Sequence, residues 1–240
     1  MGKRFEPPHY GATKCRTGEQ LLKRIADTLR ESLPNLAVTT ELSELAAAET
    51  MVDLSGRAEL VVAGTRGHGG FAGLLLGSVS HALAARAHCP AVIVHGENPG
   101  SLLGGVVLGV EPGQDEAPIR FAFATAAAVG ASVTLVRAWW MRSAYEGHYS
   151  ASEFNTAKAA EEADVTGLIK AVRGEYPLVE SSIDTIRGNA VPVLINAAQG
   201  SRLLVIGAHR HRRPLPVGTG YVVQGLLAHS HTPVAVVPIT

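Results

Sequence analysis

The stretch Glu59-Leu-Val-Val-Ala-Gly64 decides the fold, because Arg202-Leu-Leu-Val-Ile-Gly207 repeats it. From Gly64 to Gly207 the offset is 143 residues. The same offset, without a gap, joins four further pairs of residues: Gly77 and Gly220, Val79 and Val222, His88 and His231, Pro90 and Pro233. One constant offset over so many positions indicates an internal duplication, so the chain is expected to hold two similar α/β copies.

The second copy alternates short apolar runs with helical patterns, which predicts a parallel sheet with helices on both faces. We expect strands at 105–111, 131–138, 178–183, 203–206 and 234–237. The helices are expected at 115–129, 152–174 (with Ser152 as its N-cap), 191–199 and 222–229.

The first copy matches only the later part of this pattern. It predicts helices at 17–33, 42–54 and 79–88, and strands at 36–40, 59–63 and 91–94. Equivalents of the first two strands would fall before residue 1, so we expect a late start within a longer tandem protein. The expected domains are an incomplete first copy (1–97), a linker (98–104) and a complete second copy (105–240).

Composition narrows the class of protein. The 240 residues carry 21 basic and 21 acidic side chains and are 46% hydrophobic, which argues against disorder and against broad polyanion binding. The longest uncharged stretch, 121–136, is shorter than the roughly 20 residues of a membrane helix. The N-terminus lacks the apolar core of a signal peptide, and Cys15 and Cys89 form no paired motif. We expect a cytoplasmic protein that contacts neither membrane nor nucleic acid.

A glycine pattern follows the expected strand 59–63: Gly64-Thr-Arg-Gly67, nine residues, then Gly77-Ser78. Glycines at the carboxyl edge of a parallel sheet let backbone N–H groups approach a phosphate. Ser78 then opens a helix, whose N-terminus favours anions. The alternative is that the glycines only make turns and Ser78 only caps the helix. The pattern does not match a P-loop.

With its preceding LVVAGTRG and following CPAVIV, this pattern resembles the universal stress protein family. The resemblance implies two tandem domains of the adenine nucleotide α-hydrolase-like type, strand order 3-2-1-4-5, the first lacking strands 1 and 2. It implies ATP binding, with accompanying magnesium left open, and pairing of copies along strand five, with a homodimer also possible. Carried over to this sequence, the nucleotide-contacting residues are Gly64, Gly67, His68, Gly77, Ser78 and Val79.

The second copy departs from the family pattern. Its weaker candidate residues are Gly109, Val110, Glu111, Gly207 and Gly220, with Glu111 where the family usually has Asp. Arg210 stands at the position of Gly67, and Tyr221 at that of Ser78. The phosphate loop therefore reads as intact only in the first copy.

Three functions remain. The first is an ATP-binding regulatory protein of the stress response, and the second a nucleotide-independent protein that acts by dimerisation or partner docking. An enzyme that hydrolyses ATP ranks last, because no catalytic constellation emerges. The basic cluster 209–213 reads as a phosphate clamp or, preferably, a solvated loop, and the histidines lack a metal-ligand spacing.

Overall fold

The computed structural model describes residues 10–65, 76–95, 103–140, 150–209 and 220–239. The chain divides into two compact units, Met1–Ala47 and Ala48–Thr240, which are taken separately below. Among the described residues, none of the helices combines the length and apolar character needed to cross a bilayer.

The first unit consists of helix α1 (Tyr10–Ser32) and a segment that follows it without forming a strand. This segment folds back along α1, since Arg30 Nη2 donates to the carbonyl oxygen of Val38 at 2.8 Å. The prediction of a strand at 36–40 is wrong. A strand needs a neighbour for its backbone N–H and C=O groups, and no strand lies in the described part of this unit. The helix also begins earlier than the expected residue 17.

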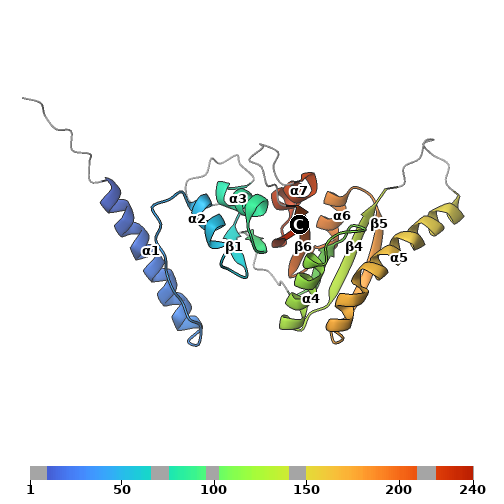
Figure 1. Cartoon of the computed structure of the whole chain (residues 1–240), viewed down its shortest axis with the longest axis horizontal. Coiled ribbons are helices and arrows are strands. Elements are labelled where there is room, and N and C mark those ends of the chain that lie inside the picture. The colour runs from blue at the N-terminus through green and yellow to red at the C-terminus, as the bar shows by residue number, and fades with distance from the viewer. Residues whose placement is uncertain (1–9, 66–75, 96–102, 141–149, 210–219, 240) are drawn as a thin grey trace, which may run out of the picture. The chain divides into compact units, whose positions relative to one another are not determined.

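The second unit holds the remaining elements, which Figure 1 distinguishes by colour and, where there is room, by label. Its helices are α2 (Ala47–Leu54, which begins at the boundary), α3 (Ser78–Arg86), α4 (Ala117–Val129), α5 (Ala151–Glu175), α6 (Ala190–Ala197) and α7 (Tyr221–His229). Its strands are β1 (Val61–Gly64), β2 (Ala91–Val94), β3 (Val106–Gly109), β4 (Val133–Trp139), β5 (Ser181–Arg187), β6 (Leu203–His209) and β7 (Val234–Ile239).

These strands form one mixed seven-stranded sheet in the order β1-β2-β7-β6-β3-β4-β5. Among the described strands only β2 and β7 are antiparallel neighbours, and there Ala91 lies opposite Val236 and Ile93 opposite Val234. The α/β class is therefore confirmed, with a mixed rather than a purely parallel sheet.

The core occupies both faces of this sheet, because successive side chains on a strand point to opposite sides. Val106 and Leu108 of β3 belong to the apolar cluster that contains residues of α4 and α5. Val107 belongs to the cluster that contains residues of α6 and α7. Every residue of β3 is buried, as expected of a strand covered on both faces.

The N-cap expected at Ser152 is two residues too late. Ser150 is the N-cap of α5, and its hydroxyl accepts from the backbone N–H of Glu153 at 3.2 Å. The Glu153 carboxylate accepts in return from the backbone N–H of Ser150 at 2.8 Å. This reciprocal capping box satisfies two N–H groups that a bare helix end would leave open.

Candidate functional site

The topology singles out the carboxyl edge between β3 and β6. From β3 the chain adds β4 and β5 on one side, then crosses back to add β6 and β7 on the other. The two crossovers leave a crevice at the carboxyl ends of β3 and β6, the usual ligand position in open α/β sheets. A cavity of about 690 Å³ opens at this place.

The cavity is lined by residues of four strands (β3, β4, β6 and β7), the loop after β3, helix α6 and the start of α7. The residues that matter for its chemistry are Gly109, Val110, Glu111, Gln114, Asp115, Arg137, Leu194, Ile206, Gly207, His209, Gly220 and Tyr221. All five candidate residues of the second copy are among them, so the structure brings together Gly109, Val110, Glu111, Gly207 and Gly220.

Two of these glycines, Gly109 and Gly207, lie so close to neighbouring side chains that the structure has little room for a Cβ atom at either position. A Cβ on Gly109 would lie 2.9 Å from Ile206 Cδ1 and 3.1 Å from Leu194 Cδ1. A Cβ on Gly207 would lie 2.9 Å from Pro118 Cγ. Contacts under 3.0 Å force a neighbour to move, so a larger residue at either position would displace these side chains.

An ionic cluster stands beside the cavity. Arg137 of β4 is 14% exposed, and its Nε lies 2.7 Å from a Glu161 carboxylate oxygen on α5. Its Nη1 lies 3.5 Å from Glu111 Oε1, and the Glu111 side chain is 77% exposed. Arg137 thus joins the end of β3 to α5, and it leaves the Glu111 carboxylate open to a ligand.

The loop after β3 presents a side-chain amide nitrogen that has no partner among the described residues. Gln114 Oε1 accepts from the backbone N–H of Glu111 at 3.1 Å, which fixes the orientation of the side chain. Gln114 Nε2 is buried and makes no hydrogen bond among the described residues. A buried donor of this kind is costly unless a ligand or water satisfies it.

The N-terminus of α7 borders the same cavity. Its N-cap is Gly220, which supplies no side-chain hydrogen bond, and a Cβ there would meet nothing within 4 Å. Tyr221, the first helical residue, is 72% exposed. The first N–H groups of the helix therefore have no side-chain cap, an arrangement that suits an anionic group.

The first copy shows only part of its expected phosphate loop. Gly64 ends β1, and Gly77 is the N-cap of α3 without a side-chain hydrogen bond. Ser78 is the exposed first residue of that helix, so the alternative in which Ser78 is its cap is wrong. Val79 is half-buried in the next position. Gly67 and His68 lie outside the described residues, as does most of the basic cluster 209–213.

Hydrogen bonds draw the two ends of this loop together. The backbone N–H of Gly77 donates to the carbonyl oxygen of Thr65 at 2.8 Å, and Ser80 Oγ donates to the carbonyl oxygen of Gly64 at 2.6 Å. The uncapped start of α3 is thereby held at the end of β1.

The buried thiol of Cys89 adds no reactive group to the site. Burial raises the pKa of the Cys89 thiol, which lies in the apolar cluster of α2, α3, β1 and β2. A thiol with a raised pKa stays protonated and unreactive at neutral pH. Within the described ranges no three His, Cys, Asp or Glu side chains gather to hold a metal ion.

The sequence pointed to Glu111 but not to its neighbours. Arg137 carries a signal in hindsight, since a charged residue interrupts the apolar run 133–139 near the end of a buried strand. No pattern in the sequence points to Gln114, because the orientation of its side chain is set by a hydrogen bond from the backbone N–H of Glu111 to its side-chain oxygen.

Comparison with known proteins assigns the chain to a family. The family model described as "Universal stress protein family" matches residues 8–95 and 105–238. The chain belongs to the universal stress protein family. The resemblance drawn from the glycine pattern is thus confirmed.

Relatives agree with this assignment, and a solved structure shares the fold. Universal stress protein Rv2005c of Mycobacterium tuberculosis is 26% identical over 237 residues, covering 96% of this chain and 80% of that protein. A universal stress protein of Mycolicibacterium smegmatis is 42% identical over 80 residues, 33% of this chain and 27% of that one. A universal stress protein structure from Archaeoglobus fulgidus DSM 4304 has a TM-score of 0.72 at 15% identity, covering 98% of this chain and 83% of that chain.

Proposed function

We propose that this universal stress protein binds an adenine nucleotide in the cavity between β3 and β6 and acts as a regulatory, non-catalytic protein of the cytoplasmic stress response. The observation that carries the proposal is the convergence of a carboxylate, an unpartnered amide donor and an uncapped helix N-terminus on one cavity at the carboxyl edge of the sheet.

Each of these groups suits one part of a nucleotide. The Glu111 carboxylate accepts hydrogen bonds, as the exocyclic amine of adenine or a ribose hydroxyl requires. The Gln114 amide donates to a ring nitrogen or a hydroxyl oxygen. The open N–H groups at the start of α7 suit a phosphate, because the helix dipole and the free donors both favour negative charge.

The first copy provides a second phosphate position under the same proposal. The uncapped start of α3 at the end of β1, with Gly64, Gly77 and Ser78, fits the glycine loop of the family. The resemblance assigns Gly67 and His68 to the same loop and favours ATP as the ligand. Pairing of the two copies through the fifth strand of each is part of this proposal, and β2 and β7 are those strands.

The test is isothermal titration calorimetry of the full chain with AMP and ATP. Glu111→Gln should weaken binding about tenfold or more, because a carboxylate accepts charge-assisted hydrogen bonds that an amide does not. Asp164→Asn, at an exposed carboxylate of α5 outside the cavity, is the matched control and should bind normally.

Gly67→Arg, which copies the residue at the equivalent position of the second copy, separates the two sites. Loss of ATP binding in this variant alone would place the phosphate site in the first copy. Absence of heat with both nucleotides in the unmodified chain would reject the proposal and favour the nucleotide-independent docking function.

A further inference from the structure

A groove lies at the amino edge of the sheet, where α5 ends and the chain turns into β5. It has a volume of about 580 Å³ and is lined by residues from the second half of α5 and by the loop 177–180. It shares no lining residue with the nucleotide cavity, which opens at the carboxyl edge of the same sheet. The groove is therefore a second, separate surface of this unit.

The floor of the groove is apolar and one of its walls ends in a large exposed side chain. Ile169 and Val179 are 1% and 8% exposed and belong to the apolar cluster that contains residues of α4 and α5. A Cβ on Gly174 would meet nothing within 4 Å, so the groove stays open beside the last turn of α5. Leu178, on the loop, is 96% exposed. An exposed apolar group beside an open apolar groove with a polar rim marks an interaction surface.

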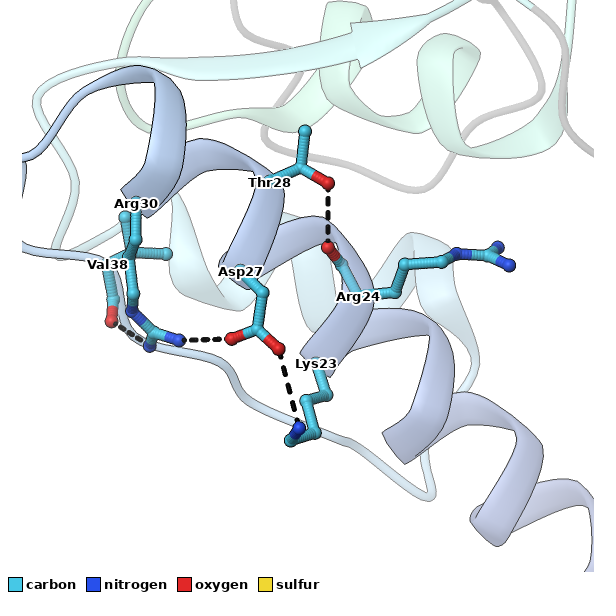
Figure 2. Close-up of polar contacts among 6 residues, drawn as sticks. All are labelled: Lys23, Arg24, Asp27, Thr28, Arg30 and Val38. Atoms are coloured by element: carbon cyan, nitrogen blue, oxygen red, sulfur yellow. Dashed lines mark hydrogen bonds and ion pairs between the residues drawn. The ribbon is translucent and has the colours of Figure 1, made fainter.

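Two cations of α5 line the same groove without an acidic partner. Lys170 and Arg173 are exposed and lie three residues apart, so they project from one side of the helix. Neither makes an ion pair with a described residue. On α1, by contrast, Lys23 and Arg30 pair with Asp27 at 3.4 and 3.2 Å (Figure 2). No acidic residue stands three or four positions from Lys170 or Arg173, which explains the difference.

The lining is polarised from the helix to the loop. The two cations lie on α5, whereas Leu178 and Glu180, the one acidic residue among the lining residues, lie on the loop. A complementary ligand therefore has acids toward α5 and an apolar group toward the loop. Alternate side chains of an extended peptide point the same way and lie about 6–7 Å apart. This spacing is close to the roughly 5–6 Å between the Cβ atoms of helix residues three apart, so two alternate acids can reach Lys170 and Arg173 together.

We propose that this groove binds an acidic, extended segment of a partner protein. Two carboxylates at alternate positions of the segment pair with Lys170 and Arg173, and an aliphatic or aromatic side chain packs on Leu178. The apolar floor favours a peptide over a nucleic acid or free phosphate, because burying apolar surface requires an apolar occupant. This docking surface is independent of the nucleotide cavity and of any nucleotide bound there.

The test is selection of random dodecapeptides displayed on phage against the immobilised full chain, followed by fluorescence anisotropy with the enriched peptides. These peptides should carry two acids at alternate positions near a large apolar residue. Lys170→Glu combined with Arg173→Glu turns two attractions into repulsions and should weaken their binding about tenfold or more. Leu178→Ala should weaken it about fivefold through lost apolar contact. Arg24→Glu, at an exposed arginine of α1, is the control and should leave binding unchanged.

Reversing the charges of the peptide guards against misfolding of the doubly substituted chain. An enriched peptide whose two acids are replaced by lysine should bind the chain that carries Lys170→Glu and Arg173→Glu, and not the unmodified chain. A selection that enriches no acidic peptide overturns the proposal. Acidic peptides that bind equally well to the unmodified chain, to the doubly substituted chain and to Leu178→Ala also overturn it, because their binding then does not involve the groove.

Discussion

At the scale of single residues, Gly109 is packed tightly against side chains that line the cavity. A Cβ there would stand 2.9 Å from Ile206 Cδ1, and both Ile206 and Leu194 line the cavity. Because these contacts are with side-chain ends, the neighbours can shift, and they would shift into ligand space. We expect Gly109→Ala to cost about 1 kcal/mol in the free energy of unfolding, measured by urea denaturation, and to weaken nucleotide binding.

Gly167, inside α5, provides the control for this substitution. A Cβ at Gly167 meets nothing within 4 Å, and alanine favours a helix interior over glycine by about 0.8–1 kcal/mol. Gly167→Ala should therefore stabilise the fold while Gly109→Ala destabilises it. Equal effects of the two substitutions would show that the cavity edge is not tightly packed.

The residues around this cavity differ in whether the sequence alone could predict their role. Glu111 could be predicted because it directly follows an apolar run, where the carboxyl edge of a parallel sheet must lie. Arg137 and Gln114 could not, since Arg137 pairs with Glu161, which is distant in the sequence, and Gln114 accepts from the backbone N–H of Glu111. The first pairing depends on tertiary structure, and the second on the conformation of the loop after β3, neither of which shows as a pattern of residue types.

At the scale of elements, the start of α5 depends on the reciprocal bonds of Ser150 and Glu153. Ser150→Ala removes the hydroxyl acceptor and should cost about 1 kcal/mol in the free energy of unfolding. Thermal unfolding followed by circular dichroism at 222 nm measures this loss. Ser152→Ala, two residues on, is the matched control and should change stability little, because its hydroxyl makes no capping bond.

This capping box also makes a contribution to the stability of the fold that depends on pH. Hydrogen bonds from the backbone N–H and then the hydroxyl of Ser150 lower the pKa of the Glu153 carboxyl below its ordinary value. A lowered pKa in the folded state contributes stability above the unfolded pKa, about 4.3, and that stability is lost as pH falls through the folded value. The difference between Ser150→Ala and the unmodified chain should therefore be present at pH 7 and shrink below about pH 4.

A helix or strand could be predicted from its hydrophobic pattern where the fold also supplies a neighbouring element for it to pair with or pack against. The pattern at 36–40 resembles a strand, yet no other strand lies in the described part of its unit, so the backbone there follows α1 instead. The N-cap error has a different cause: Ser150 stands three residues before Glu153, the spacing of a capping box, whereas Ser152 directly precedes it. The spacing of Ser150 and Glu153 in the sequence was therefore sufficient to predict this cap.

At the scale of the second unit, the two copies share one sheet through the antiparallel contact of β2 with β7. Ile93 of β2 is fully buried opposite Val234 and belongs to the apolar cluster that also contains residues of β3 and β6. Because that core is continuous across the contact, the residues of both copies in this unit should unfold together. A destabilising substitution in β2 should then also lower the unfolding midpoint that is measured at the far end of the sheet.

Ile93→Ala tests this coupling. It should cost about 2–4 kcal/mol, because the cavity it leaves is surrounded by packed side chains. The two tryptophans of the chain, Trp139 and Trp140, both lie in the second copy, and Trp139 is 3% exposed on β4. Their fluorescence should report the same lowered midpoint in urea as circular dichroism does. Leu178→Ala, at a side chain 96% exposed, is the control and should leave the midpoint unchanged. A tryptophan transition that stays at its original midpoint while the dichroism shifts would mean that the copies unfold separately, and that the β2–β7 contact joins two independent cores.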